Sequence, residues 1–509
     1  MMLRDFTLRG VALQDFRGRD ESLFDLTFRG GRLTRKKRLP ELGQRNLFLT
    51  PGFNDAHIHL LHLGLSRQRC NLSGCGSLDE ALETVAEFSR GGHTSGDILW
   101  AVNWDESHWA DQRLPTREEI DRVVADSPVV MRRVCGHRAV LNTAAMQEAG
   151  RRWGALDPGG HLSEEQAMGL ANLWPPTPEE LEEAFLSAQD AAIAMGITRA
   201  SEMGSHAALD TYLTLEERGL LKIDVKLFVA PERLEEVVRL RQEGRFTGPR
   251  LRLGGVKLYA DGSVGARTAA LRHPYEDAAH TGRLLYQDQD LFDMLDRCAR
   301  EELPAAIHAI GDAAIDQVLH QLERIAQERG LEATRGVSIE HAEMVDTPML
   351  DRIEALEIGL SMQPNFVERW GRPGGLYDRA LGSQRCMAMN PFREVWDRKL
   401  PLVFGSDGMP MDPSMGLEGA VSHPMAEARL MSEEALSAYL GGRLAAAGYW
   451  DSEDWWAYGR GGGVLYGYDP LDLTSGDLSR VPVQGVLWCG EWVLEPSADL
   501  FRAGVVHAG

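Results

Sequence analysis

Two histidines one residue apart, His57 and His59, stand in the apolar run FNDAHIH. Side chains alternate between the two faces of a β-strand, so a strand here places both imidazoles on the same face. Imidazole nitrogens bind divalent transition metals, zinc among them. Taken alone, a His-x-His pair is equally explained by coincidence on a polar surface, so the residues near it decide between the two interpretations.

Four other apolar runs carry a residue of similar chemistry at or near their ends: Lys257, His308, His341 and Asp407. In a parallel barrel the carboxyl ends of all strands open on one face, so these side chains converge with the histidine pair. Four histidines and an aspartate at strand ends are hard to explain as core packing. A metal site is therefore the better interpretation.

Lys257 is the unusual member of this set, because an ammonium group is not a metal ligand. One interpretation is an ion pair, with Asp261 as the partner. The other is that a lysine buried beside two cations loses its proton and adds carbon dioxide. The resulting carbamate has two oxygens that bridge the metals.

Eight short apolar runs supply the strands that position these residues, and amphipathic helical patterns lie between most of them. The runs are 53–59, 197–203, 224–230, 253–260, 305–310, 337–343, 359–364 and 401–407. Strands that alternate with helices predict a parallel sheet, and eight of them favour closure into a barrel over an open sheet. The predicted fold class is α/β, a (β/α)8 TIM-like barrel.

Residues 60–196 separate the first run from the second, which is more chain than one βα unit requires. This segment has helix and strand patterns of its own, including a capping box at Thr116 and Glu119, and we expect an inserted subdomain. Short alternating runs at both termini predict antiparallel strands that pair into one small sheet. The expected division is 1–52 for the first part of that sheet, 53–445 for the barrel with its insertion, and 446–509 for the second part.

The composition limits the classes of partner. The chain has 509 residues, and 54 Lys+Arg against 76 Asp+Glu give a net charge of −22, which argues against nucleic acid as a partner. We find no signal-peptide pattern and no run of roughly 18 apolar residues, so neither secretion nor a membrane location is expected. The six cysteines form no CxxC pair, which fits a reducing cytoplasm. A cytoplasmic protein with a small-molecule substrate is the expectation, and a homodimer is one option for its assembly.

Several segments together resemble the amidohydrolase superfamily, specifically the amidohydrolase-3 branch of YtcJ-like metal-dependent hydrolases. They are PGFNDAHIHL, GVKLYADGSVGARTAAL, IHAIGDAAID, SIEHAEMV, SMQP and GSDGMPMDP. The resemblance covers about residues 45–440 and implies a distorted barrel flanked by a small β-sandwich from both termini. It also implies a metal centre held by His57, His59, His308, His341, Asp407 and a carboxylated Lys257.

The chemistry implied by this resemblance is hydrolysis of a carbon–nitrogen bond other than a peptide bond. A hydroxide that bridges two divalent metals would be the nucleophile, with zinc expected first and iron or manganese tolerated. Asp407 would act as general base and then as general acid toward the leaving nitrogen.

Further residues are candidates for binding the substrate or supporting the metal ligands. Asp261 and Arg267 follow the fourth run and would hold a substrate anion or carbonyl, or else form a loop hinge with a structural salt bridge. His137 and Trp104 in the insertion would cap the site, or else pack the core of the insertion. Glu340 points to the other side of its strand from the histidine that follows it, so we expect it to support a ligand from behind.

Two alternatives to the hydrolase stay open at this stage. One is a deaminase that uses a single metal on the same barrel, which would normally carry a glutamate where Gly311 stands and would not need Lys257. The other is a non-catalytic barrel that only binds a ligand. The carboxyl-terminal segment also lacks the usual phrase of the family and has GRGGGVLYGYDPLDLTSGDL in its place, which makes the geometry of the terminal sheet uncertain.

Overall fold

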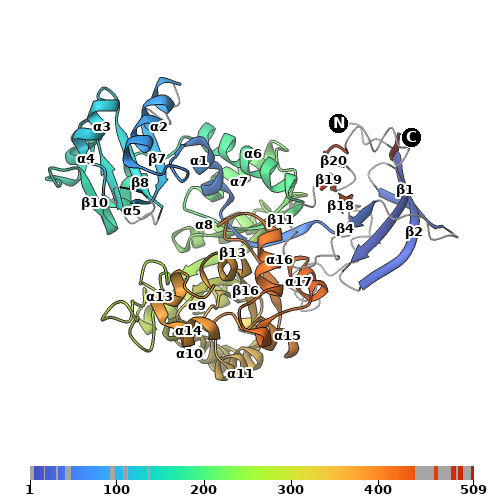
Figure 1. Ribbon diagram of the computed structural model, residues 1–509. Coiled ribbons are helices and arrows are strands. Elements are labelled where there is room, and N and C mark those ends of the chain that lie inside the picture. The colour runs from blue at the N-terminus through green and yellow to red at the C-terminus, as the bar shows by residue number, and fades with distance from the viewer. Residues whose placement is uncertain are drawn as a thin grey trace. The chain divides into compact units, whose positions relative to one another are not determined.

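The computed structural model describes most of the chain. The described residues are 5–15, 18–29, 32–39, 47–91, 98–106, 109–110, 113–134, 138–441, 463–467, 483–488, 491–496 and 506–508. The chain divides into two compact units, labelled by element in Figure 1. The first unit is Met1–His59 together with Gln189–Gly509, and the second is Leu60–Ala188.

The first unit contains eight parallel strands in one sheet. They are β5 (Phe53–Ile58), β11 (Ile197–Met203), β12 (Asp224–Val229), β13 (Leu251–Tyr259), β14 (Ala305–Ala309), β15 (Ser338–His341), β16 (Gly359–Met362) and β17 (Leu402–Phe404). Their order in the sheet is their order in the chain. Asp407 N donates to His57 O at 2.7 Å, which brings the segment after the last strand against the first. The predicted (β/α)8 barrel is confirmed.

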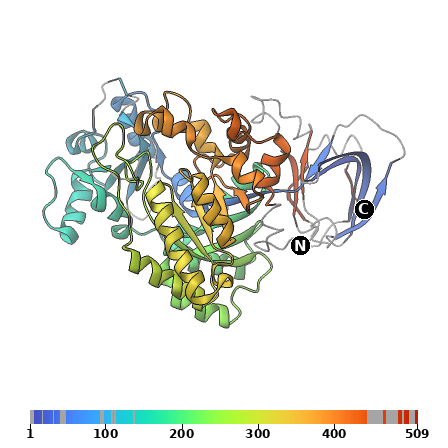
Figure 2. The ribbon, with the colours of Figure 1, turned by 90° about the horizontal axis from the view of Figure 1, so that it is seen from below.

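Helices follow the strands in turn, and Figure 2 shows them around the sheet. They are α6 (Pro178–Ala194), α7 (Ala208–Glu217), α8 (Leu234–Gln242), α9 (Asp288–Arg300), α10 (Asp312–Arg329), α11 (Thr347–Leu356), α12 (Pro364–Trp370), α13 (Leu376–Leu381), α14 (Ser383–Ala388), α15 (Phe392–Asp397), α16 (Pro413–Val421) and α17 (Ser432–Tyr439). Helix α11 illustrates the local causes. The Asp346 side chain caps it by accepting from Met349 N, and its buried residues Met349, Ile353 and Leu356 recur at helical spacing.

Both termini contribute to a second sheet of the first unit, as predicted. Its strands are β1 (Phe6–Asp15), β2 (Gly18–Arg29), β3 (Arg32–Arg38), β4 (Phe48–Thr50), β18 (Gly463–Tyr466), β19 (Val483–Trp488), β20 (Glu491–Leu494) and β21 (Val506–Ala508). Buried apolar side chains from both ends of the chain, including Phe28 and Leu487, share one core. Only two residues separate the end of β4 from the start of β5, so this sheet leads directly into the strand that carries His57.

The second unit is built on a five-stranded sheet in the order β10-β9-β8-β7-β6. Its elements are α1 (Leu60–Gln68), β6 (Cys70–Asn71), α2 (Leu78–Arg90), β7 (Leu99–Trp104), α3 (Arg117–Val123), β8 (Val129–Arg133), β9 (Arg138–Leu141), α4 (Thr143–Trp153), β10 (His161–Ser163) and α5 (Glu164–Leu173). The predicted capping box is present, with Thr116 and Glu119 each accepting from the other's backbone nitrogen. In the described part of the chain, no helix has the length and apolar character needed to cross a bilayer.

Candidate metal centre

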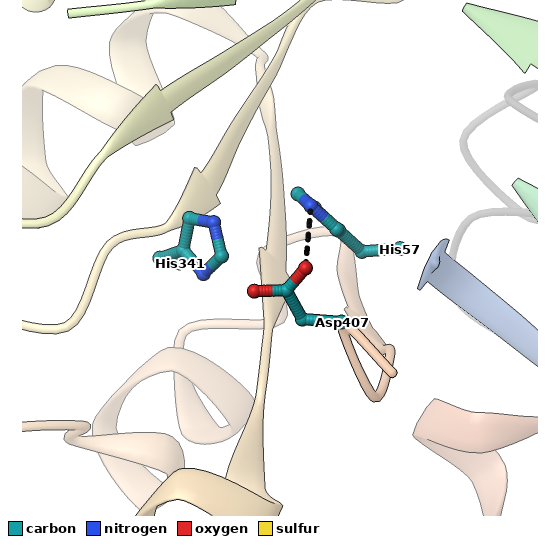
Figure 3. Close-up of side chains that lie close together, drawn as sticks. All are labelled: His57, His341 and Asp407. Atoms are coloured by element: carbon teal, nitrogen blue, oxygen red, sulfur yellow. Dashed lines mark ion pairs between the residues drawn. The ribbon is translucent and has the colours of Figure 1, made fainter. Parts of the chain in front are cut away.

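Three side chains from strands far apart in the sequence meet at the carboxyl ends of the barrel strands. His57 belongs to β5, His341 ends β15, and Asp407 follows β17. Each offers one ligand atom, and these three atoms lie within 4.8 Å of one another. Figure 3 shows the carboxylate of Asp407 directed at the ring of His57, with 3.7 Å between Oδ1 and Nε2. Such a group can hold a metal ion.

The other three predicted ligands lie around this group. His59 Nε2 is 3.3 Å from Asp407 Oδ1. The ring of His308 lies 4.4 Å from that of His341, measured between centroids. Lys257 is connected to the group through Tyr259, whose ring centroid is 5.0 Å from Lys257 Nζ and 5.5 Å from the His308 ring. The barrel thus gathers all six residues at one end, and their role as ligands stays a prediction.

Lys257 occupies an unusual environment for a lysine. Its side chain is 1% exposed, and its Nζ makes no hydrogen bond with any described residue. Burial lowers the pKa of Lys257 to about 8, so a substantial share of the amine is neutral near physiological pH. A buried, easily deprotonated amine without a hydrogen-bond partner has the properties that carboxylation requires.

Three of the histidines are held in the form that binds metals. Burial and the nearby charge of Lys257 lower the pKa of His308 to about 4 and that of His57 well below its usual value. Burial, followed by the charge of His308, lowers the pKa of His341 in the same way, and His341 Nδ1 makes no hydrogen bond with a described residue. A neutral imidazole has a free lone pair, so these rings can bind a metal without first losing a proton.

Asp407 and His59 shift each other's pKa in the direction opposite to that of burial. Burial alone would raise the pKa of Asp407, but the hydrogen bond with His59 and the charges of the neighbouring histidines lower it. Burial alone would lower the pKa of His59, and the bond to Asp407 raises it instead. Asp407 is therefore a carboxylate at neutral pH.

Glu340 holds His57 from behind. Its Oε2 accepts a hydrogen bond from His57 Nδ1 at 2.6 Å, while its Oε1 accepts one from Ser338 Oγ at 2.5 Å. With Nδ1 engaged in this way, the other ring nitrogen, Nε2, is the one that faces Asp407. Carboxylates placed behind a histidine fix its tautomer and ring orientation, and this is the geometry that such support requires.

Comparison with known proteins identifies the family. Residues 45–448 match the sequence profile of the amidohydrolase family. This chain belongs to that family. The Bacillus subtilis (strain 168) protein YtcJ, named as an amidohydrolase, is 28% identical over 419 residues, which cover 77% of each chain. The N-substituted formamide deformylase of Arthrobacter pascens is 24% identical over 473 residues, or 86% of each chain.

A solved structure agrees with this assignment. An uncharacterized metal-dependent hydrolase from Pyrococcus furiosus superposes with a TM-score of 0.74 at 26% sequence identity, and the match covers 91% of this chain and 99% of the other. The resemblance inferred from the sequence motifs is confirmed. The protein is a metal-dependent amidohydrolase that acts on carbon–nitrogen bonds, and members of this family generally bind divalent metal ions.

The amidohydrolase uses Asp261 and Arg267 in contacts within the protein. Asp261 is buried and accepts hydrogen bonds from the backbone nitrogens of Ala270, Ile310 and Gly311, at 2.9, 3.0 and 2.9 Å. Arg267 forms an ion pair with Asp277 and donates to two backbone carbonyls of its own loop. This geometry is that of the structural salt bridge that the sequence left as an alternative, and contact of either residue with a substrate stays a prediction.

The two candidates in the insertion have different outcomes. Trp104 is fully buried in the core of the second unit, where its ring stacks on that of Trp109 at 5.8 Å. That placement corresponds to the packing alternative. His137 lies outside the described residues, so its place at the site stays a prediction.

One supporting residue of the amidohydrolase was missed at the level of sequence. Asp55 is buried, and its carboxylate accepts from Ser406 N at 2.9 Å and from Ser406 Oγ at 2.5 Å. It therefore ties the first strand to the residue before Asp407. The signal was present, because Asp55 lies two residues before His57 and alternation puts both on one face of the strand.

Proposed function

We propose that this amidohydrolase cleaves a carbon–nitrogen bond other than a peptide bond, with two divalent metal ions and with Asp407 as general base and acid. The observation that carries the proposal is the convergence of His57, His341 and Asp407, with ligand atoms within 4.8 Å of one another. Zinc is the first choice of metal, because histidine and carboxylate ligands suit it, although iron and manganese accept the same set.

The residues present fit such a centre. The ions would be held by His57, His59, His308, His341, Asp407 and a carboxylated Lys257. Within the described part of the chain, Lys257 Nζ and His341 Nδ1 have no hydrogen-bond partner, and this supports the assignment, since buried polar atoms normally have one. When bound, the ions would polarise the substrate carbonyl and lower the pKa of a water molecule.

The protein's own groups would move the proton. Asp407 is a carboxylate beside His59 and is 12% exposed, so it can accept a proton from the attacking water. Passing that proton to the nitrogen of the substrate lets an amine depart instead of an amide anion. Glu340 would act by keeping the ring of His57 oriented through its 2.6 Å hydrogen bond.

Deamination on the same barrel has less support. It would place a glutamate three residues after His308, where this chain has Gly311. A Cβ atom at Gly311 would lie 2.0 Å from the carbonyl oxygen of Ala270, so no side chain fits without movement of the backbone. N-acyl and N-formyl amines in a cytoplasmic setting are the substrates we would screen first, since the similar Arthrobacter protein is named for deformylation of N-substituted formamides.

The test combines metal analysis with one substitution. Protein purified without chelators should contain two ions per chain and carry the added mass of a carbamate on Lys257. The variant Asp407→Asn should fold normally and lose roughly 10²- to 10⁴-fold in kcat for amine release from an N-formyl amine. The control variant is Asp351→Asn, because Asp351 is 66% exposed and pairs with Arg398 on the outside of the barrel. No metal after reconstitution, or full activity in Asp407→Asn, would overturn the proposal.

A further inference from the structure

Three apolar side chains at the end of β13 and in the loop that follows it are unusually exposed. Tyr259 is 42% exposed, Leu284 42% and Leu285 46%. We call these three residues the apolar shelf. Leu285 N donates to Ala260 O at 2.8 Å, so the backbone that carries both leucines runs beside the end of β13. Single exposed apolar residues are common, but a group of them next to chemistry-bearing residues indicates a surface that binds something apolar.

The shelf lies at the reacting end of the barrel. Tyr259 follows Lys257 by two residues on β13, so both side chains leave the same face of the strand. The Tyr259 ring is 5.5 Å from the ring of His308 and 5.0 Å from Lys257 Nζ. A substrate group that contacts this ring would therefore lie close to the bond that the metal centre cleaves. Met409, two residues beyond Asp407, adds a further apolar side chain at this end, 40% exposed.

One cation of the loop after β13, Arg267, is engaged in contacts within the protein. Arg267 Nε donates to both carboxylate oxygens of Asp277, at 2.9 and 3.1 Å, and Nη2 donates to one of them at 2.5 Å. Nη1 donates to the carbonyl oxygens of Val264 and Gly265. A substrate carboxylate would have to displace Asp277 to gain this guanidinium. Arg267 is thus used for the structure of its own loop, while the two leucines of that loop offer apolar surface.

We propose that the substrate carries a neutral apolar group, aryl or branched alkyl, within a bond or two of the scissile carbon–nitrogen bond, and that Tyr259, Leu284 and Leu285 bind it. This inference rests on the proposed function, because it takes the metal centre as the place of reaction. It assigns the substrate class to amides that carry such an apolar group.

The first experiment compares substrates on the metal-loaded enzyme. In a series of N-alkylformamides from methyl to isobutyl and benzyl, kcat/KM should rise about 4-fold for each added methylene that is buried. A flat series would overturn the inference.

The second experiment locates the effect on the shelf. The variants Leu284→Ser and Leu285→Ser should each lower kcat/KM for the benzyl substrate about 5- to 10-fold and leave the methyl substrate nearly unchanged. The control is Leu331→Ser, since Leu331 is a leucine of similar exposure, 39%, that precedes β15 at the opposite end of the strands. Equal losses in the shelf variants and in the control would contradict the assignment.

A binding measurement separates this inference from the proposed hydrolysis. Calorimetry with benzamide and acetamide needs no turnover, and benzamide should bind at least 10-fold more tightly, with the difference lost in a Leu284→Ser/Leu285→Ser double variant. Tight benzamide binding without hydrolysis of any amide would refute the proposed function but would still support the assignment of the apolar shelf as a binding surface. Equal binding of the two amides would refute the shelf. A dimer that falls apart in the double variant would also refute it, because a second copy would then be the occupant.

Discussion

Replacing Asp261 by asparagine tests whether this residue anchors the metal centre or contacts the substrate. Asp261 Oδ2 accepts from Ala270 N and Gly311 N, and Oδ1 accepts from Ile310 N. Two of these donors, Ile310 and Gly311, lie two and three residues after His308, so Asp261 fixes the segment just beyond that histidine. An asparagine has one oxygen and one NH2 group, and the NH2 group must then face at least one backbone N–H.

The cost follows from this count of donors. A buried donor left without an acceptor costs roughly 1–3 kcal/mol, and the lost hydrogen bond adds about 1 kcal/mol. We therefore expect Asp261→Asn to reduce the free energy of local opening at this site by roughly 2–4 kcal/mol. That corresponds to about 30- to 1,000-fold faster exchange of the protected amide hydrogens there.

Hydrogen exchange read by mass spectrometry measures this effect directly. Peptides that cover 261–272 and 305–312 should exchange faster in Asp261→Asn, while peptides from the second unit keep their rates. The control is Asp190→Asn, because Asp190 is exposed and its ion pair with Lys222 at 2.9 Å should be worth less than about 1 kcal/mol. Unchanged exchange together with a raised KM would refute the anchoring argument and assign Asp261 to the substrate.

Two further substitutions test the support around His57. Glu340→Gln should weaken metal affinity roughly 10- to 100-fold in competition with a chelator, because His57 Nδ1 loses its charged acceptor. Ser338→Ala removes only a hydrogen bond to Glu340 and should have a smaller effect. Unaltered affinity in Glu340→Gln would contradict the role of that bond. Gly405→Ala should lower both the melting temperature and the metal content, because the new Cβ would lie 2.4 Å from His57 N and force the two strands apart. The control is Gly150→Ala, in helix α4, where the new methyl group meets open space. It should raise the free energy of unfolding by up to about 1 kcal/mol. Similar changes of melting temperature in both variants would rule out the steric argument.

The barrel and the cluster of candidate ligands were predictable from the sequence because both depend on simple alternation. The alternation of side chains in a run such as FNDAHIH predicts a strand, and eight such strands fit few folds other than a barrel. The same alternation predicts that Glu340 and His341 point to opposite sides of their strand, and in the structure Glu340 is hydrogen-bonded to His57. Residue type at a strand end was sufficient for these inferences.

The contacts of Asp261 and Arg267 were not predictable in the same way. The acceptors and donors that engage them are backbone groups and a loop carboxylate, Asp277, whose positions depend on how an irregular segment folds. Neither the period of a strand nor that of a helix applies to such a segment, so the sequence shows a suitable charge but not its partner. Trp104 presents a similar problem, since a large ring near a polar motif fits a core and a binding site equally well.

Backbone strain at the metal centre explains why the ligands depend on one another. His341 and Asp407 have φ angles of +71° and +55°, in the left-handed region that costs a residue other than glycine roughly 1–3 kcal/mol. The bonds that hold these turns run between strands: Asp407 N donates to His57 O, and Ala342 N donates to Ala309 O, next to His308. Each bond therefore joins the turn of one candidate ligand to the strand of another. A substitution that shifts one strand end moves two ligands at once, so the substitutions predicted to matter most are those at the junctions, at Asp261 and Gly405.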